Sequence, residues 1–238
     1  MKIIIIKKRT LLIIFISMVL VLVILALWNN FRFRAVATFM PSITKVIVLD
    51  AGHGGVDPGT VSKSGIKEKD INLTIAKYLR DYLEQSGAVV IMTRTKDIGL
   101  YSSDGSLRKK KNEDLKARKE IVKNSRGDIF ITIHLNSFPD SKYYGAQTFY
   151  PPDNSGGKNL AERIQEELIN ALNRDNKRVA LSKDGIYLIR GLDIPTALVE
   201  CGFLSNPNEE KLLIKSDYQK KIAWAIYMGI QNYFARNP

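Results

Sequence analysis

The chain has 238 residues, of which 45% are apolar and 25% are charged. This apolar content suffices for one good-sized hydrophobic core and excludes a disordered chain. A single cysteine excludes a disulfide scaffold, and two histidines exclude any site that needs three imidazoles. The net charge of +12 is concentrated in two places: residues 1–40 hold six Lys or Arg and no acid, and residues 107–126 hold nine basic and three acidic residues.

Residues 11–28 form an apolar run that only Ser17 interrupts. Four basic residues precede this run. A helix of this length nearly spans the hydrocarbon core of a bilayer, and the preceding charges predict a cytoplasmic start and an exported remainder. The small-residue pattern at 35–37 suits signal cleavage, but it lies beyond the apolar run, so we favour an uncleaved anchor. We therefore expect a membrane anchor or signal segment with a linker over residues 1–40. A folded domain over residues 41–238 then lies outside the cytoplasmic membrane.

Apolar runs and helical periodicities alternate after residue 40. Strands are expected in runs that begin at Val46, Ala88, Asp128 and Gly145, and in two short segments, IYLIR (186–190) and TALVECGF (196–203). Helices are expected at 71–83 with Gly87 as the stop, at 107–126 with Leu115, Ile121 and Val122 inward, at 160–168, and after Ser216 as a cap. This alternation predicts an α/β fold: a three-layer, twisted, mostly parallel sheet flanked by helices on both faces, preceded by one N-terminal transmembrane or signal helix.

The basic segment 107–126 has two interpretations. Clustered Lys and Arg can neutralise a polyanion, in which case an anionic envelope polymer is favoured over nucleic acid. However, acidic residues are interspersed with the basic ones, and no aromatic residue is interleaved for base stacking. We therefore favour a solvated loop and helix face, and we expect no nucleic-acid partner.

Three strands are expected to end in a residue that can carry chemistry: His53, His134 and Glu200. Sites in α/β sheets form beyond the carboxyl ends of the strands, so these residues are expected to meet. Glu68 lies at the start of the helix that carries Ile71, where it would either cap the helix or point toward His53. Taken singly, each residue has an ordinary structural explanation; taken together, they favour function.

Two imidazoles and one carboxylate make a familiar ligand set for one zinc ion that leaves a fourth position open. His53, Glu68 and His134 are thus the candidate ligands, although their spacing does not match the helical H-E-x-x-H motif. Zinc would acidify a water molecule and polarise a carbonyl, and Glu200 is the candidate for taking and returning the proton. The expected reaction is metal-assisted hydrolysis of an amide.

An alternative site pairs Cys201 with His134 as nucleophile and base in a peptidase. Side chains alternate along a strand, so Cys201 would point into the core if Glu200 faces the site, and we rank this alternative well behind zinc. The glycines of DAGHGGVDPG are expected to allow the tight turns that fold His53 into the site. Asp50 would either orient a ligand or cap a turn.

Several ordered segments resemble the zinc-dependent N-acetylmuramoyl-L-alanine amidases of the amidase type 3 family, over Val46 to about Phe234. They are VIVLDAGHGGVDPG, GIKEKDINL, DIFITIHLNS, GAQTFY and ALVECGFLSNPNE. The resemblance implies zinc ligands at His53, Glu68 and His134, a catalytic carboxylate at Glu200, and hydrolysis of the amide that joins N-acetylmuramic acid to L-alanine in peptidoglycan.

The leading apolar segment, GAQTFYPP and GIYLIRG resemble most closely the germination-specific subgroup of endospore-formers. That resemblance implies removal of the stem peptide during spore cortex maturation, before muramic δ-lactam forms, in the space between the forespore membranes. Expected partners are peptidoglycan, the membrane through residues 11–28, and an activator protein of unknown identity if the zinc site is incompletely formed alone. A further alternative is a non-catalytic cell-wall-binding module.

Overall fold

The computed structural model describes residues 8–102 and 104–237, without the side chains of residues 29–39. Lys2 and Lys7 of the basic N-terminus lie outside the described residues, as do the side chains of the small-residue pattern at 35–37. The chain divides into two compact units, Met1–Pro41 and Ser42–Pro238. The assignment of residues 1–40 as anchor or signal and of residues 41–238 as the catalytic domain remains a prediction.

The first unit is helix α1, Lys8–Phe39. Its segment Lys8–Trp28 is long and apolar enough to cross a membrane by length and composition, and none of it is buried against protein. Length and composition do not separate an anchor from a signal segment, because both need an apolar helix near the N-terminus.

The second unit is built on one six-stranded sheet in the order β2-β1-β3-β6-β4-β5. The strands are β1 (Val46–Ala51), β2 (Val89–Met92), β3 (Ile129–Asn136), β4 (Gln147–Tyr150), β5 (Leu181–Ser182) and β6 (Thr196–Phe203). All neighbouring strands run parallel except β4 and β6, which are antiparallel, so the predicted mostly parallel sheet is confirmed.

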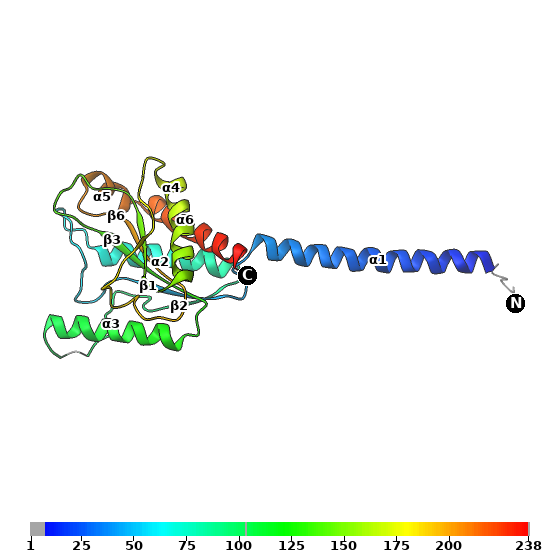
Figure 1. Ribbon diagram of the computed structural model, residues 1–238, viewed down its shortest axis with the longest axis horizontal. Helices are drawn as coiled ribbons and strands as arrows, with labels where there is room; N and C mark the ends of the chain where they lie inside the picture. The colour runs from blue at the N-terminus through cyan, green and yellow to red at the C-terminus, as the bar shows by residue number, and fades with distance from the viewer. Residues whose placement is uncertain (1–7, 103, 238) are drawn as a thin grey trace. The chain divides into compact units, whose positions relative to one another are not determined.

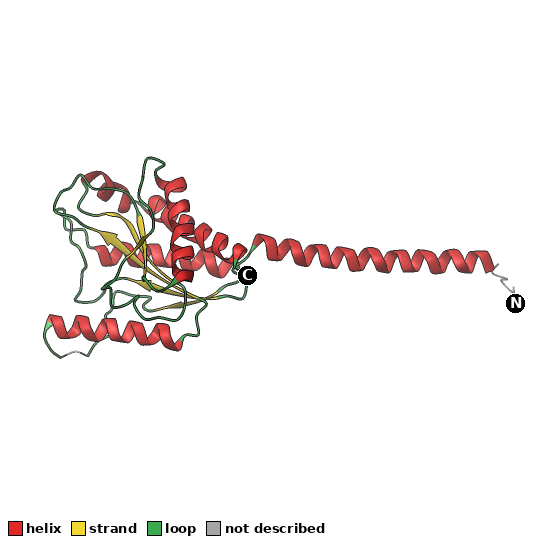
Figure 2. Ribbon diagram, in the orientation of Figure 1, coloured by secondary structure: helices red, strands yellow, loops and turns green. Residues whose placement is uncertain are grey.

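Helices cover both faces of this sheet (Figures 1 and 2). They are α2 (Glu68–Gln85), α3 (Leu107–Asn124), α4 (Ser155–Leu172), α5 (Pro207–Leu213) and α6 (Ser216–Arg236). Helices α2, α4 and α6 pack together on one face over the alternating residues Ile129, Ile131 and Ile133. The opposite face carries Phe130 and its neighbours, and Leu115 and Val122 of α3 pack against them.

One predicted strand and one predicted helix cap are wrong. IYLIR forms a turn in which the Arg190 amide donates to the Ile186 carbonyl, because its consecutive buried residues Leu188 and Ile189 cover the α3 face of the sheet instead of pairing as a strand. Ser216 does not cap α6: Lys215 is the N-cap, and the Ser216 hydroxyl pairs with that of Tyr78. Helix α5 was not predicted, although Asn206 caps it and Pro207 begins it.

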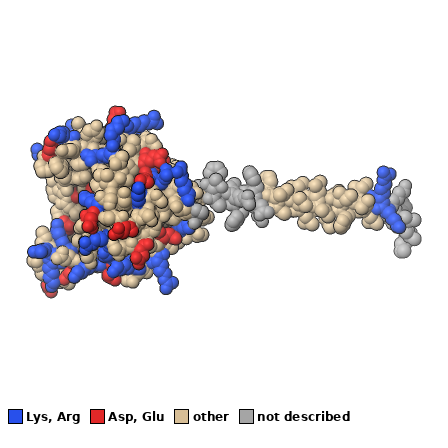
Figure 3. Space-filling view, viewed as in Figure 1, with Lys and Arg blue, Asp and Glu red and all other residues tan. Residues whose placement is uncertain are grey.

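The predicted solvated face of residues 107–126 is confirmed for the outward side of α3, but the predicted apolar inward side is wrong in part. Figure 3 shows Lys and Arg side chains gathered at the lower edge of the second unit, where Figure 1 places α3. The inward face of this helix is nevertheless polar, because Asp114 and Arg118 are buried together with Val122, while Leu115 and Ile121 are only half-buried. Arg118 is 1% exposed, so its charge belongs to the interior.

Candidate active site

The structure brings all four predicted site residues to one cavity of about 490 Å³, which His53, Glu68, His134 and Glu200 line. His134 and Glu200 are register partners on the neighbouring parallel strands β3 and β6, so their side chains leave the same face of the sheet. His53 follows the end of β1, and Glu68 is the first residue of α2. The prediction that these residues lie close together at the strand ends is therefore confirmed.

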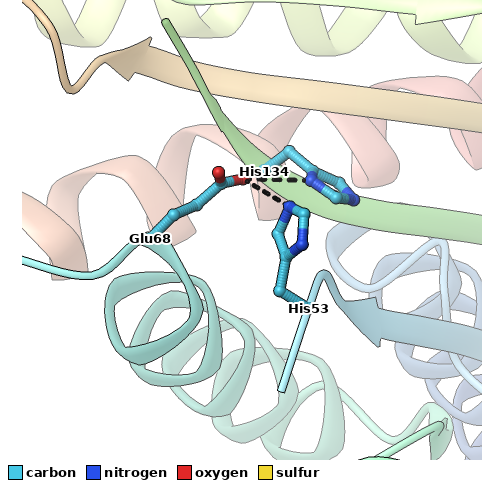
Figure 4. Close-up of side chains that lie close together, drawn as sticks. All are labelled: His53, Glu68 and His134. Carbon is cyan, nitrogen blue, oxygen red and sulfur yellow. Dashed lines mark hydrogen bonds and ion pairs between the residues drawn. The ribbon is translucent and has the colours of Figure 1, made fainter. Parts of the chain in front are cut away.

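Glu68 Oε1 lies between the two imidazoles (Figure 4). It is 3.1 Å from His134 Nδ1 and 3.3 Å from His53 Nε2. The two rings meet edge to face with their centroids 4.9 Å apart. One ligand-type atom from each of the three residues falls within 4.8 Å of the others, which makes the group a candidate holder of a metal ion.

The Glu68 carboxylate is fixed by backbone amides from outside its own helix. Oε2 accepts from the Thr60 amide at 2.8 Å, and Oε1 accepts from the Leu135 amide at 2.9 Å. Burial raises the pKa of Glu68, but its bonds to His134 and His53 outweigh this and hold the pKa well below its usual range. The carboxylate is thus ionised and points toward the two histidines. It does not cap α2, which was the other role expected from the sequence.

Two carboxylates support His53, whose backbone has an unusual conformation with φ at 63°. Asp57 Oδ2 bonds His53 Nδ1 at 2.7 Å. Asp50 bonds Arg118, whose Nη2 donates to the His53 carbonyl at 2.7 Å. Burial lowers the pKa of His53, but the bonds to Asp57 and Glu68 outweigh it and raise the pKa to about 9. Asp50 therefore neither orients a ligand side chain nor caps a turn; it acts on the backbone of His53 through Arg118.

Glu200 lines the same cavity, and its Oε2 atom is buried without a hydrogen-bond partner among the described residues. Burial raises the pKa of this carboxyl, and the negative charge of Glu68 adds to the rise, while His134 opposes it. A carboxyl with a raised pKa and an unpaired oxygen can both take and return a proton.

Cys201 points away from this cavity. Its thiol is buried in the core under α2, α4 and α6, where its contact is the Val199 carbonyl at 3.8 Å. Burial raises the pKa of the thiol well above its ordinary value, so the thiolate needed for nucleophilic attack is disfavoured. The geometry therefore opposes the Cys201–His134 peptidase.

The group of His53, Glu68 and His134 fits a zinc ion. Ligand atoms of a tetrahedral zinc with bonds of about 2.0–2.1 Å are separated by roughly 3.3 Å, close to the spacing of Glu68 Oε1 from the two ring nitrogens. The carboxylates of Asp57 and Glu68 favour positive charge at this point, which a divalent cation would supply. Two nitrogens and one oxygen also leave a position free toward the cavity.

Sequence reasoning missed Asp57, Lys111 and Arg118. The sequence did offer a signal for Asp57, because it follows His53 by four residues within DAGHGGVDPG. Arg118 follows Asp114 by four residues, a spacing that is equally common in exposed helix pairs and so carries little information.

Comparison with known proteins agrees with this geometry. A family model described as N-acetylmuramoyl-L-alanine amidase matches residues 47–232. The germination-specific N-acetylmuramoyl-L-alanine amidase of Bacillus subtilis is 43% identical over 197 residues, which cover 82% of each chain.

Two solved structures share the fold. The CwlD amidase from Clostridioides difficile, solved in complex with the GerS lipoprotein, has 53% identity and a TM-score of 0.79, covering 80% of this chain and 98% of that one. The catalytic domain of the amidase CwlV from Bacillus (Paenibacillus) polymyxa has 31% identity and a TM-score of 0.69, covering 80% and 98%. With its site at the strand ends and a family match over most of its second unit, this chain belongs to the N-acetylmuramoyl-L-alanine amidase family.

Proposed function

We propose that the protein is a zinc-dependent amidase that cleaves the bond between N-acetylmuramic acid and L-alanine, with His53, Glu68 and His134 as ligands and Glu200 as the proton carrier. The convergence of two imidazoles on one fixed carboxylate oxygen, with distances of 3.1 and 3.3 Å, is the observation that carries it. When bound, zinc supplies a Lewis acid that polarises the scissile carbonyl and lowers the pKa of a water molecule.

Glu200 has the proton-transfer role in this proposal. It takes a proton from the attacking water as the new carbon–oxygen bond forms, and it gives that proton to the alanine nitrogen as the carbon–nitrogen bond breaks. The products are a lactyl carboxylate and a free L-alanine amino group. The raised pKa of Glu200 suits this cycle, because it makes the carboxylate a stronger base than an ordinary one.

We further propose that the substrate is spore cortex peptidoglycan and that a lipoprotein assists the enzyme. The germination-specific relative supports the first statement, and the complex of the Clostridioides difficile amidase with the GerS lipoprotein supports the second. The apolar helix at Lys8–Trp28 supports export to the outer side of the cytoplasmic membrane, as an anchor or a signal.

Removal of zinc is expected to abolish peptide release, because none of the other described residues that line the cavity supplies a Lewis acid. The full chain in detergent is incubated with cortex or vegetative peptidoglycan, and new L-alanine amino termini are counted by mass spectrometry. A chelator should stop release, zinc should restore it, and thiol alkylation should leave it unchanged, since Cys201 is buried. Release that survives chelation but not alkylation would move the chemistry to Cys201.

Substitution of Gly52 by alanine is expected to weaken zinc binding by roughly 10- to 100-fold, the range typical when the surroundings that orient a metal ligand are disturbed. A methyl group there would overlap the His134 ring. Zinc affinity is measured by competition with a chromophoric chelator. Gly127→Ala is the matched control, because its methyl group would crowd Val48 at the opposite end of β3. That variant should lose stability and keep its zinc affinity. A Gly52→Ala protein that binds zinc as tightly as Gly127→Ala would contradict the role of His134.

A further inference from the structure

The cavity holds a chain of contacts that continues from His53 into the basic helix α3. Lys111 Nζ lies 2.6 Å from Asp57 Oδ1, and Asp57 Oδ2 lies 2.7 Å from His53 Nδ1. The other ring nitrogen of His53, Nε2, faces Glu68 Oε1. Lys111 also lines the cavity, so one cation of the basic segment sits beside the proposed metal site.

The two nitrogens of an imidazole are not equivalent once one of them is bonded. A carboxylate that accepts from Nδ1–H fixes the proton there, which leaves the Nε2 lone pair free for a metal and fixes the plane of the ring. Asp57 satisfies this condition for His53. Its second oxygen is occupied by Lys111, and the Gly59 amide donates to that same oxygen at 3.3 Å. Both oxygens of Asp57 are thus engaged away from the ion.

The contact of Lys111 with Asp57 is not needed to dock α3. Arg118 on the same helix holds Asp50 and the carbonyls of Ala51 and His53, and it is fully buried. The side chains of Asp57 and Lys111 are 18% and 42% exposed, and an ion pair at that depth adds little to folding. The pair instead acts on the orientation of His53, one of the proposed ligands.

We propose that Asp57 and Lys111 are positioning residues for His53: Asp57 fixes the ring so that Nε2 binds the metal, and Lys111 holds Asp57 in that role. The basic segment is then part of the metal centre's support, which neither a solvated face nor a polyanion site explains. This inference rests on the proposed zinc site.

Asp57→Asn tests it directly, since the amide keeps the shape and loses the charge. Zinc affinity of the full chain in detergent is measured by competition with a chromophoric chelator, and the cobalt-substituted protein reports ligand geometry through its visible spectrum. We expect a 10- to 100-fold loss of affinity, the range typical for removal of such a partner, together with an altered cobalt spectrum. Lys111→Gln should act in the same direction by roughly two- to fivefold, as expected for one half-exposed ion pair.

Asp81→Asn is the matched control, because Asp81 forms an equally short ion pair with Arg80 far along α2 from Glu68. It should leave affinity and spectrum unchanged. If Asp57→Asn fails to fold, Lys111→Gln carries the test alone. Parental affinity and an unchanged cobalt spectrum in the folded variants would overturn the positioning role while the zinc site stands. A parent protein that takes up no zinc would overturn both proposals together.

Discussion

Replacing Glu200 with glutamine is expected to lower turnover by about 10²–10⁴-fold, the range that a positioned acid or base contributes. Zinc uptake should not change, because the proposed ligand set of His53, Glu68 and His134 does not include Glu200. Single-turnover release of stem peptide gives the rate, and metal analysis of the same sample gives the zinc content. Wild-type turnover in a zinc-loaded Glu200→Gln protein would remove Glu200 from the mechanism.

The same variant should be as stable as the parent or more stable at neutral pH when both are free of metal. Because the pKa of Glu200 is raised by folding, its stabilising contribution is complete at low pH and is lost as pH rises through the folded pKa. The buried carboxyl therefore costs stability at neutral pH, and a neutral side chain removes that cost.

Glu209→Gln is the matched control. Its carboxylate is half-buried near the end of the same strand, but it accepts from the amides of Phe203 and Gly145 and is not among the residues that line the cavity. It should keep its turnover per folded molecule, which separates a carboxyl that lines the cavity from one that binds backbone amides.

The four central site residues could be predicted because each lies where an apolar strand or an amphipathic helix meets polar sequence. The carboxyl ends of parallel strands lie at one edge of the sheet. His134 and Glu200 were therefore expected to lie close together once their strands were identified. Alternation along β6 also predicted which neighbour faces the cavity: Glu200 does, and Cys201 enters the core.

The support of the site could not be predicted in the same way. A helix that turns Asp114 and Arg118 inward has the same sequence pattern as one that turns them to solvent, because the partner, Asp50, is remote in sequence. The prediction of a strand at IYLIR was wrong for a related reason. A short apolar run predicts burial, but whether it is buried as a strand or as a turn over the sheet depends on which strand edges are free, and that is a property of the assembled fold.

Replacing Arg118 with methionine is expected to destabilise the protein by about 3–5 kcal/mol, the usual cost of leaving one partner of a buried ion pair alone. Arg118 Nη1 lies 2.7 Å from Asp50 Oδ1, and both side chains are almost completely buried. For a unit of this size the melting temperature should fall by roughly 10 °C, which calorimetry measures. Zinc affinity should fall as well, since the His53 carbonyl loses its donor.

The dependence of this loss on pH tests its cause. Burial raises the pKa of Asp50, but Arg118 and bonds from Thr132 and Thr93 outweigh it and lower the pKa to about 2 from 3.8. A depressed pKa gives stability that is complete above the unfolded value and is lost as pH falls toward 2. The deficit of Arg118→Met relative to the parent should thus be largest at neutral pH and shrink in acid. Adding Asp50→Asn should recover part of it, because the uncompensated charge is gone; a deficit that is constant with pH and unrelieved in the double variant would assign the loss to packing alone.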